Sequence, residues 1–170
     1  FDTARPYLEF AKQNGIGLRG HTLVWHGQTS IWFFKKNYQN DWNAPNVDRE
    51  TMLARMENYI KGVLEFVQTE YPGVIYAWDV VNEAMEENEE DGYRKSFWYK
   101  TIGPDFIQHA FRFARKYAAE GVSLFYNDYN TFIPKKRDFI CDLILKPLTE
   151  EGLIDGMGMQ SHMIIGDTNL

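Results

Sequence analysis

Four short apolar segments alternate along the chain with longer amphipathic segments that have helical periodicity. Parallel strands need a crossover element between them, so this alternation predicts βαβ units and a parallel sheet. A chain built in this way can form an open doubly wound sheet or part of a closed barrel. The segments expected to form strands are LRGHTLVWH (18–26), VIYAWDVVNEA (74–84), VSLFYNDYN (122–130) and GMGMQSH (156–162).

Polar residues stand at the carboxyl end of each expected strand. Parallel α/β proteins bind ligands at this edge, in open sheets and in barrels alike. An open sheet usually carries a glycine-rich phosphate loop after an early strand, and neither G-x-G-x-x-G nor a P-loop pattern occurs in this sequence. We therefore expect the strand-end residues to meet in one site that holds no nucleotide. They are His26, Glu83, Asn127 and His162.

Helices are expected between the strands. Gly15 ends the first helix and Asp48 caps the second. Pro134 begins the last helix and Pro147 ends it. The expected helices are Arg5 to Asn14, Asp48 to the Tyr71-Pro72-Gly73 stop, Asp105 to Glu120, and Pro134 to Lys146-Pro147.

Composition restricts the partners that such a domain can have. The 170 residues are 44% hydrophobic and carry a net charge of −6, which fits one globular domain and disfavours a phosphate backbone as ligand. No apolar run approaches the roughly 20 residues that span a bilayer, and the first residues lack a signal-peptide pattern. We expect no nucleic-acid partner, no membrane span and, with a single cysteine, no internal disulfide.

The four histidines do not form a metal-binding pattern. Strand alternation places His21 and Trp25 on one face and His26 on the other, so the first two histidines are poorly placed to share a metal. His109 and His162 do not complete a zinc spacing. We expect neither a metal nor another cofactor.

Glu83 is the carboxylate most suited to chemistry. Alternation puts it on the same face as Val81 and Asp79, and a carboxylic acid kept partly buried is a natural general acid. The alternative is a solvated residue at the start of the acidic loop 85–91. The residues alone leave these two interpretations equal.

The last expected strand offers a crowded face. Gly156 and Gly158 share that face with Gln160 and His162, which suggests a polar pocket above tight packing. Packing alone also explains the two glycines. A carboxylic acid with amide, imidazole and indole neighbours fits glycoside hydrolysis, whereas a serine hydrolase is disfavoured because no G-x-S-x-G elbow occurs.

Four ordered motifs carry a specific resemblance: GHTLVWH, WDVVNEA, YNDYN and GMGMQSH. Together with Arg94, Ser96 and Trp98 they resemble glycoside hydrolase family ten, the retaining endo-β-1,4-xylanases, over essentially all of the chain. The resemblance implies a TIM (β/α)8 barrel of which residues 1–170 supply about half, roughly strands three to six, as part of one catalytic domain. It implies xylan or a xylo-oligosaccharide as substrate.

The resemblance also implies a role for each matching residue. Glu83 corresponds to the general acid/base, and Asn82 to the group that binds the sugar 2-hydroxyl. Gln160 corresponds to the hydrogen-bond partner of the acid/base. The other matches are His21 and Trp25 at the subsite on the non-reducing side, Asn127 and Tyr129 near the leaving group, and His162 beside the nucleophile.

The nucleophile itself has no match. In the family it is a glutamate in a T-E-L-D-type strand some tens of residues after Q-S-H, and the chain ends at Leu170, eight residues past His162. We therefore expect the chain to act with the remaining portion of the same enzyme and to be inactive alone.

Two other functions stay open. One is a carbohydrate-binding or inactive fragment that holds sugars through Trp25, Tyr129 and Trp98, and the other is a barrel glycosidase for β-1,3-xylan or β-glucan. A secreted or cell-surface location is implied by the resemblance, because a polymeric substrate does not enter a cell intact.

Overall fold

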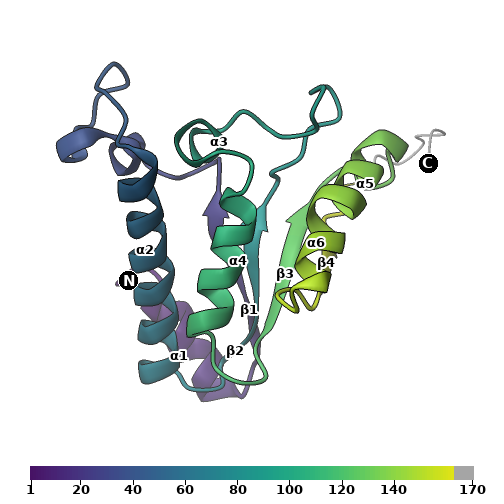
Figure 1. Cartoon of the computed structure of the whole chain (residues 1–170). Coiled ribbons are helices and arrows are strands. Elements are labelled where there is room, and N and C mark those ends of the chain that lie inside the picture. Colours follow the sequence, from purple (N-terminus) through teal and green to yellow (C-terminus); the bar gives the residue numbers. More distant parts are fainter. Residues whose placement is uncertain (163–170) are drawn as a thin grey trace.

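The computed structural model describes residues 1–162, which form a parallel sheet covered by helices on one side (Figure 1). The sheet has four strands in the order β1-β2-β3-β4, and each neighbouring pair is parallel. The strands are β1 (Leu18–Trp25), β2 (Ile75–Asn82), β3 (Ser123–Asp128) and β4 (Gly156–Met159). The predicted βαβ arrangement is confirmed, although β4 is shorter than expected.

The helices α1 (Arg5–Asn14) and α2 (Arg49–Glu70) follow the sequence prediction. Gly15 ends α1 in the left-handed conformation, with φ 64°. Asp48 caps α2, because its Oδ1 accepts a hydrogen bond from the Thr51 backbone N–H at 2.8 Å. The hydrogen bonds from Thr51 lower the pKa of Asp48.

Two helices occupy the connection between β2 and β3. The sequence predicted α4 (Phe106–Tyr117) and missed the short helix α3 (Phe97–Ile102). Ser96 caps α3 by accepting a hydrogen bond from the Tyr99 backbone N–H at 3.2 Å. Six residues are too few to show an amphipathic period, so α3 depends on its cap and on packing rather than on pattern.

The last helical segment does not end at Lys146-Pro147, so that prediction was wrong. α5 (Pro134–Ile140) continues through the π-helical turn η3 (Cys141–Leu145) into α6 (Lys146–Glu150). The Lys146 N–H bonds to the carbonyl of Cys141, five residues earlier. The wider π-turn relieves the clash that a proline causes in a regular helix, which is why Pro147 is tolerated.

A register shift in β2 overturns the predicted alternation of its side chains. The pairing of β2 with β3 is irregular between Asp79 and Val81. Asp79 contacts Arg19, which lies over the ring of Phe125 in β3. Asn82 contacts Asn127, which is two residues after Phe125 and therefore on the same face of β3. Asp79 and Asn82 therefore face the same side of the sheet despite their odd spacing, because the irregularity adds a residue to the alternation.

The other side of the sheet packs against the helices. The core combines residues of β2 and β3 with the inner faces of α2, α4 and α5. Its fully buried members include Met52, Met56, Ile60, Leu64, Val80, Ile107, Phe111, Leu124 and Tyr126.

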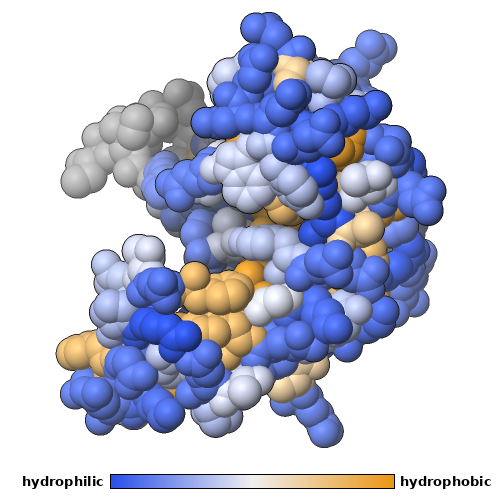
Figure 2. Space-filling model, turned by 90° about the vertical axis from the view of Figure 1, so that its left-hand side faces the viewer, coloured by the Kyte–Doolittle hydropathy of each residue, from blue (hydrophilic) through white to orange (hydrophobic). Residues whose placement is uncertain are grey.

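A second, more open apolar region lies between α1, β1 and α2. A cavity of about 520 Å³ is lined there by Phe1, Leu8, Leu18, Phe66 and Trp78 among others. Figure 2 shows apolar side chains gathered beside a hollow on this side of the molecule. Within residues 1–162 no helix is long and apolar enough to cross a membrane.

Candidate active site

Glu83 directly follows the last residue of β2 and has a left-handed backbone conformation, with φ 56°. Such a conformation costs a residue with a side chain on the order of 1–3 kcal/mol and persists only where the surroundings hold it. Here the Glu83 N–H donates to the Asn127 carbonyl at 2.9 Å. The Glu83 carbonyl accepts from Arg94 Nε at 2.8 Å.

The Glu83 carboxylate receives hydrogen bonds from two other strand ends. Gln160 Nε2 donates to Oε1 at 2.8 Å, and Trp25 Nε1 donates to Oε2 at 3.1 Å. Partial burial opposes ionisation, but these hydrogen bonds outweigh it and hold the pKa of Glu83 below its usual range. Glu83 is therefore part of the site and not a solvated residue of the acidic loop.

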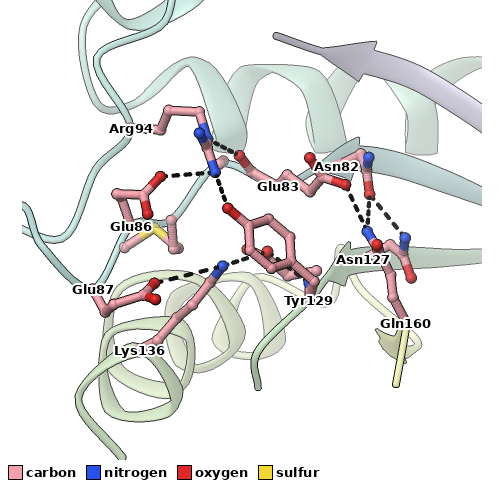
Figure 3. A network of polar contacts seen from close by, with 12 residues as sticks. Asn82, Glu83, Glu86, Glu87, Arg94, Asn127, Tyr129, Lys136 and Gln160 are labelled. Atoms are coloured by element: carbon pink, nitrogen blue, oxygen red, sulfur yellow. Dashed lines mark hydrogen bonds and ion pairs between the residues drawn. The ribbon is translucent and has the colours of Figure 1, made fainter. Parts of the chain in front are cut away.

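Three amide side chains line the sheet beside Glu83 (Figure 3). Asn82 Oδ1 accepts hydrogen bonds from Asn127 Nδ2 at 2.8 Å and from Gln160 Nε2 at 3.2 Å. Among residues 1–162 the buried Asn82 Nδ2 group makes no hydrogen bond of standard geometry, but Asn82 contributes to the lowered pKa of Glu83, so this donor lies beside the carboxylate. Asn82 is only 2% exposed, so a ligand reaches this donor only if neighbouring side chains move.

His162 and the glycines of β4 complete this end of the sheet. His162 Nε2 lies 2.9 Å from Gln160 Oε1, so the imidazole and Glu83 contact the two ends of one amide. A side chain at Gly158 would collide with Asn127 and Arg19. The crowded face predicted for the last strand is confirmed.

His21 lies on the other side of Trp25. Its Nδ1 is 3.0 Å from Asp79 Oδ2, and its ring centroid is 6.1 Å from that of Trp25. Arg19 contacts the second oxygen of Asp79 at 2.5 Å. Asp79 thus fixes the His21 ring. The role of Arg19 could not be predicted, because the register shifts between β1 and β2 depend on how the two strands pair.

Tyr129 joins the site through Arg94. Its hydroxyl accepts a hydrogen bond from Arg94 Nη2 at 2.7 Å, and Arg94 also pairs with Glu86 at 2.8 Å. Figure 3 shows the Arg94 guanidinium group bonded to both the Glu83 carbonyl and the Tyr129 hydroxyl. Arg94 is therefore a structural link within the site, which the sequence identified only as a supporting match.

His26, which was expected among the strand-end residues, lines a small cavity with Trp25, Asn82 and Glu83. The other site residues predicted from the sequence lie at or just after the carboxyl ends of the strands, except His21, which lies in the middle of β1. The structure connects them by direct contacts or through one intervening side chain: His21, Trp25, Asn82, Glu83, Asn127, Tyr129, Gln160 and His162.

Trp98 does not belong to this surface. It is 2% exposed, and its Nε1 donates to the Trp25 carbonyl at 3.0 Å. Its ring packs against Phe33 and Phe34, with centroids 5.7 Å and 4.9 Å away. The expectation that Trp98 holds a sugar is wrong, because a ring enclosed in this way offers no face to a ligand.

A cavity adjoins the site near the carboxyl end of β1. This cavity of about 210 Å³ is lined by His21, Trp25, Gln28 and Tyr59 among others, with mostly polar walls. In the part of the chain that the structure describes, no three His, Cys, Asp or Glu side chains are grouped as they would be around a metal ion.

Known proteins share both the sequence and this fold. The profile of glycosyl hydrolase family 10 matches residues 1–170. Endo-1,4-beta-xylanase B of Butyrivibrio fibrisolvens is 62% identical over 165 residues, which are 97% of this chain and 25% of that protein.

Two solved structures are similar as well. The endo-1,4-beta-D-xylanase 10B of Clostridium thermocellum, complexed with xylohexaose, aligns with a TM-score of 0.87 at 44% identity, over 94% of this chain and 33% of that one. An intracellular xylanase of Thermoanaerobacterium saccharolyticum, as a mutant complexed with xylotriose, aligns with a TM-score of 0.85 at 37% identity, over 95% and 49%. The chain therefore spans a quarter to a half of the length of these relatives.

Four parallel strands with helices on one side, and a polar site at their carboxyl ends, define about half of a parallel (β/α)8 barrel. The chain belongs to glycosyl hydrolase family 10.

Proposed function

We propose that the protein containing this chain is a retaining endo-1,4-β-xylanase and that Glu83 is its general acid/base. One observation carries the proposal: a carboxylate stands at the carboxyl ends of parallel strands, held by Gln160 and Trp25 beside an amide cluster. The relatives named as endo-1,4-beta-xylanases support the reaction and the substrate.

In the first half of the reaction, Glu83 donates its proton to the leaving glycosidic oxygen while a second carboxylate attacks the anomeric carbon. In the second half, Glu83 takes a proton from the water that releases the sugar. The nucleophile stands about 5 Å from the acid in retaining enzymes. A carboxylate at that distance raises the pKa of Glu83 by like-charge repulsion and so counteracts the lowering by Gln160 and Trp25.

The neighbouring residues have supporting roles in this proposal. The Asn82 amide beside Glu83 donates to a sugar hydroxyl, His21 and Trp25 line the subsite on the non-reducing side, and Asn127 and Tyr129 lie toward the leaving group. Gln160 holds Glu83, and His162, in contact with Gln160, orients the nucleophile.

The substrate proposal is tested with the complete protein on β-1,4-xylan, β-1,3-xylan and mixed β-glucan, by measuring new reducing ends. We expect short xylo-oligosaccharides from β-1,4-xylan and at least tenfold slower release from the others. Faster hydrolysis of β-1,3-xylan or β-glucan would contradict the proposal. The binding-fragment alternative is not favoured, because one of its three aromatic contacts, Trp98, is enclosed in the core.

We also propose a secreted or cell-surface location, which rests on the size of a xylan substrate. Family membership does not decide the location, because one related xylanase is described as intracellular. Fractionation of the producing cells, followed by xylanase assay of medium and cytosol, tests this proposal.

Replacing Gln160 by leucine is expected to change the pH dependence of the reaction. The side chain loses the donor that lowers the pKa of Glu83, so this pKa rises. Because the first step needs protonated Glu83, the fall of kcat/KM at high pH moves to higher pH in Gln160→Leu. The matched control is Gln13→Leu on the exposed side of α1, which keeps the profile unchanged. A shift to lower pH would contradict the assigned contact.

A further inference from the structure

A buried ion pair lies beneath the turn that carries Glu83, and the proposed reaction does not use it. Lys136 of α5 places its Nζ 2.8 Å from Asp128 Oδ1 at the end of β3. Both side chains are completely buried, with 0% exposure. The desolvation cost of two buried charges makes such a pair a poor source of stability, so another role should be sought.

Tyr126 connects this ion pair to the residues that follow Glu83. Its hydroxyl donates to Asp128 Oδ2 at 2.5 Å and accepts hydrogen bonds from the backbone N–H groups of Ala84 at 3.0 Å and Met85 at 3.2 Å. The tyrosine is fully buried in the helix-facing side of the sheet. One hydroxyl thus fixes two successive peptide groups directly after the acid.

We propose that Tyr126, Asp128 and Lys136 form a positioning relay that holds the Glu83 turn in its left-handed conformation, so that the carboxyl group faces the bond to be cleaved. This inference rests on the proposed function of Glu83. The three residues touch the backbone of the turn and not the substrate, so they position the acid without being catalytic residues.

The direction of the hydrogen bonds explains why the relay needs its charges. A tyrosine hydroxyl has one proton, and its oxygen can accept from two backbone amides only while that proton points elsewhere. Ionised Asp128 receives the proton, and Lys136 favours this ionised form against the burial that raises the Asp128 pKa. Without the lysine, a protonated Asp128 would no longer order the hydroxyl in this way.

Arg94 holds the same turn from the opposite side. Its Nε donates to the Glu83 carbonyl at 2.8 Å, and its backbone N–H donates to the Ala84 carbonyl at 2.9 Å. Figure 3 shows that Tyr129 lies between Arg94 and Lys136, and the Lys136 Nζ is 3.6 Å from the centroid of the Tyr129 ring. The donors and acceptors on both sides of the turn therefore belong to one connected network.

The test compares substrates whose leaving groups differ in their need for an acid. In the complete protein, Tyr126→Phe removes the hydroxyl and keeps the ring. We expect kcat/KM for xylohexaose to fall by about 10- to 100-fold, as is typical when a reacting group is displaced by about an ångström. For 2,4-dinitrophenyl β-xylobioside, whose leaving group needs no proton, kcat/KM should change by less than about threefold.

Tyr76→Phe is the matched control, because it removes a hydroxyl from an exposed tyrosine on β2, and both substrates should then react as with the wild type. Equal losses on both substrates, or no loss on xylohexaose, would overturn the relay. If Tyr126→Phe fails to fold, Asp128→Asn is measured in the same way and decides by the same criterion.

The same experiment separates this inference from the proposed function. If the wild-type protein hydrolyses neither substrate, the proposed function fails and the relay with it. If the wild type is active and Glu83→Gln loses xylohexaose hydrolysis while Tyr126→Phe does not, the proposed function stands and the relay alone is wrong.

Discussion

Glu83→Gln in the complete protein is expected to lower kcat/KM for xylan by about 10²- to 10⁴-fold, the range that a positioned general acid/base contributes. Glutamine has nearly the size of glutamate, and its carbonyl oxygen can still accept one of the hydrogen bonds that Gln160 and Trp25 donate. It cannot protonate the leaving oxygen. Binding of a xylo-oligosaccharide, measured by calorimetry, should stay within a few-fold of the wild type.

The matched control for this prediction is Glu90→Gln. Glu90 is an exposed residue of the acidic loop, so the substitution removes one negative charge nearby without touching the site. We expect its activity to equal that of the wild type. Equal activity of the two variants would show that Glu83 is not the acid/base.

Lys136→Met is expected to lower the free energy of unfolding by about 3–5 kcal/mol, because it leaves the buried Asp128 carboxylate without its partner. Methionine fits the space of the lysine stem, so loss of the charge and not of packing dominates. Chemical unfolding of the complete protein, followed by tryptophan fluorescence, measures the change.

A double variant shows whether the charge is the cause. Asp128→Asn combined with Lys136→Met also removes the fully buried carboxylate that lost its partner, and leaves Glu87, 4.0 Å from the Lys136 Nζ position and 18% exposed. We expect it to be more stable than Lys136→Met alone. The alternative is that the double variant loses as much free energy of unfolding as the two single variants lose together. In that case the ion pair does not explain the loss, and packing around α5 does.

Periodicity alone was enough to predict most of the fold. The bounds of α1 match the structure, and the Asp48 cap of α2 is confirmed by its hydrogen bond to Thr51. The errors occurred where a local rule was overridden. Pro147 continues a helix because a π-turn precedes it, and α3 is too short to produce a period.

The candidate site was predicted better by its motifs than by strand alternation. Alternation assigned Glu83 to the face of Asp79, but the shift between Asp79 and Val81 breaks that rule. A register shift depends on how a strand pairs with its neighbour, so the sequence of one strand does not reveal it. The common strand-end position did predict that Glu83 and Asn127 lie together, and Gln160 was expected on the same strand face as the strand-end residue His162.

The positioning residues could be predicted only in part. Tyr126 and Asp128 are two apart on β3, and alternation puts them on one face. Lys136 lies in the basic and polar stretch 134–138, whose composition is typical of a solvent-exposed start of a helix. Its side chain is nevertheless fully buried. Its burial depends on how α5 packs over the end of β3, and this tertiary contact leaves no local pattern in the sequence.

The central claim is that Glu83 is the acid/base of a retaining glycosidase, and azide rescue tests it most directly. With Glu83→Ala in the complete protein, 2,4-dinitrophenyl β-xylobioside can still form the glycosyl-enzyme, but water attack lacks its base. Azide needs no base: it attacks the anomeric carbon, forms the C–N bond and releases the nucleophilic carboxylate. We predict faster turnover with azide and β-xylobiosyl azide as product; no acceleration, or an α-azide, would contradict the claim.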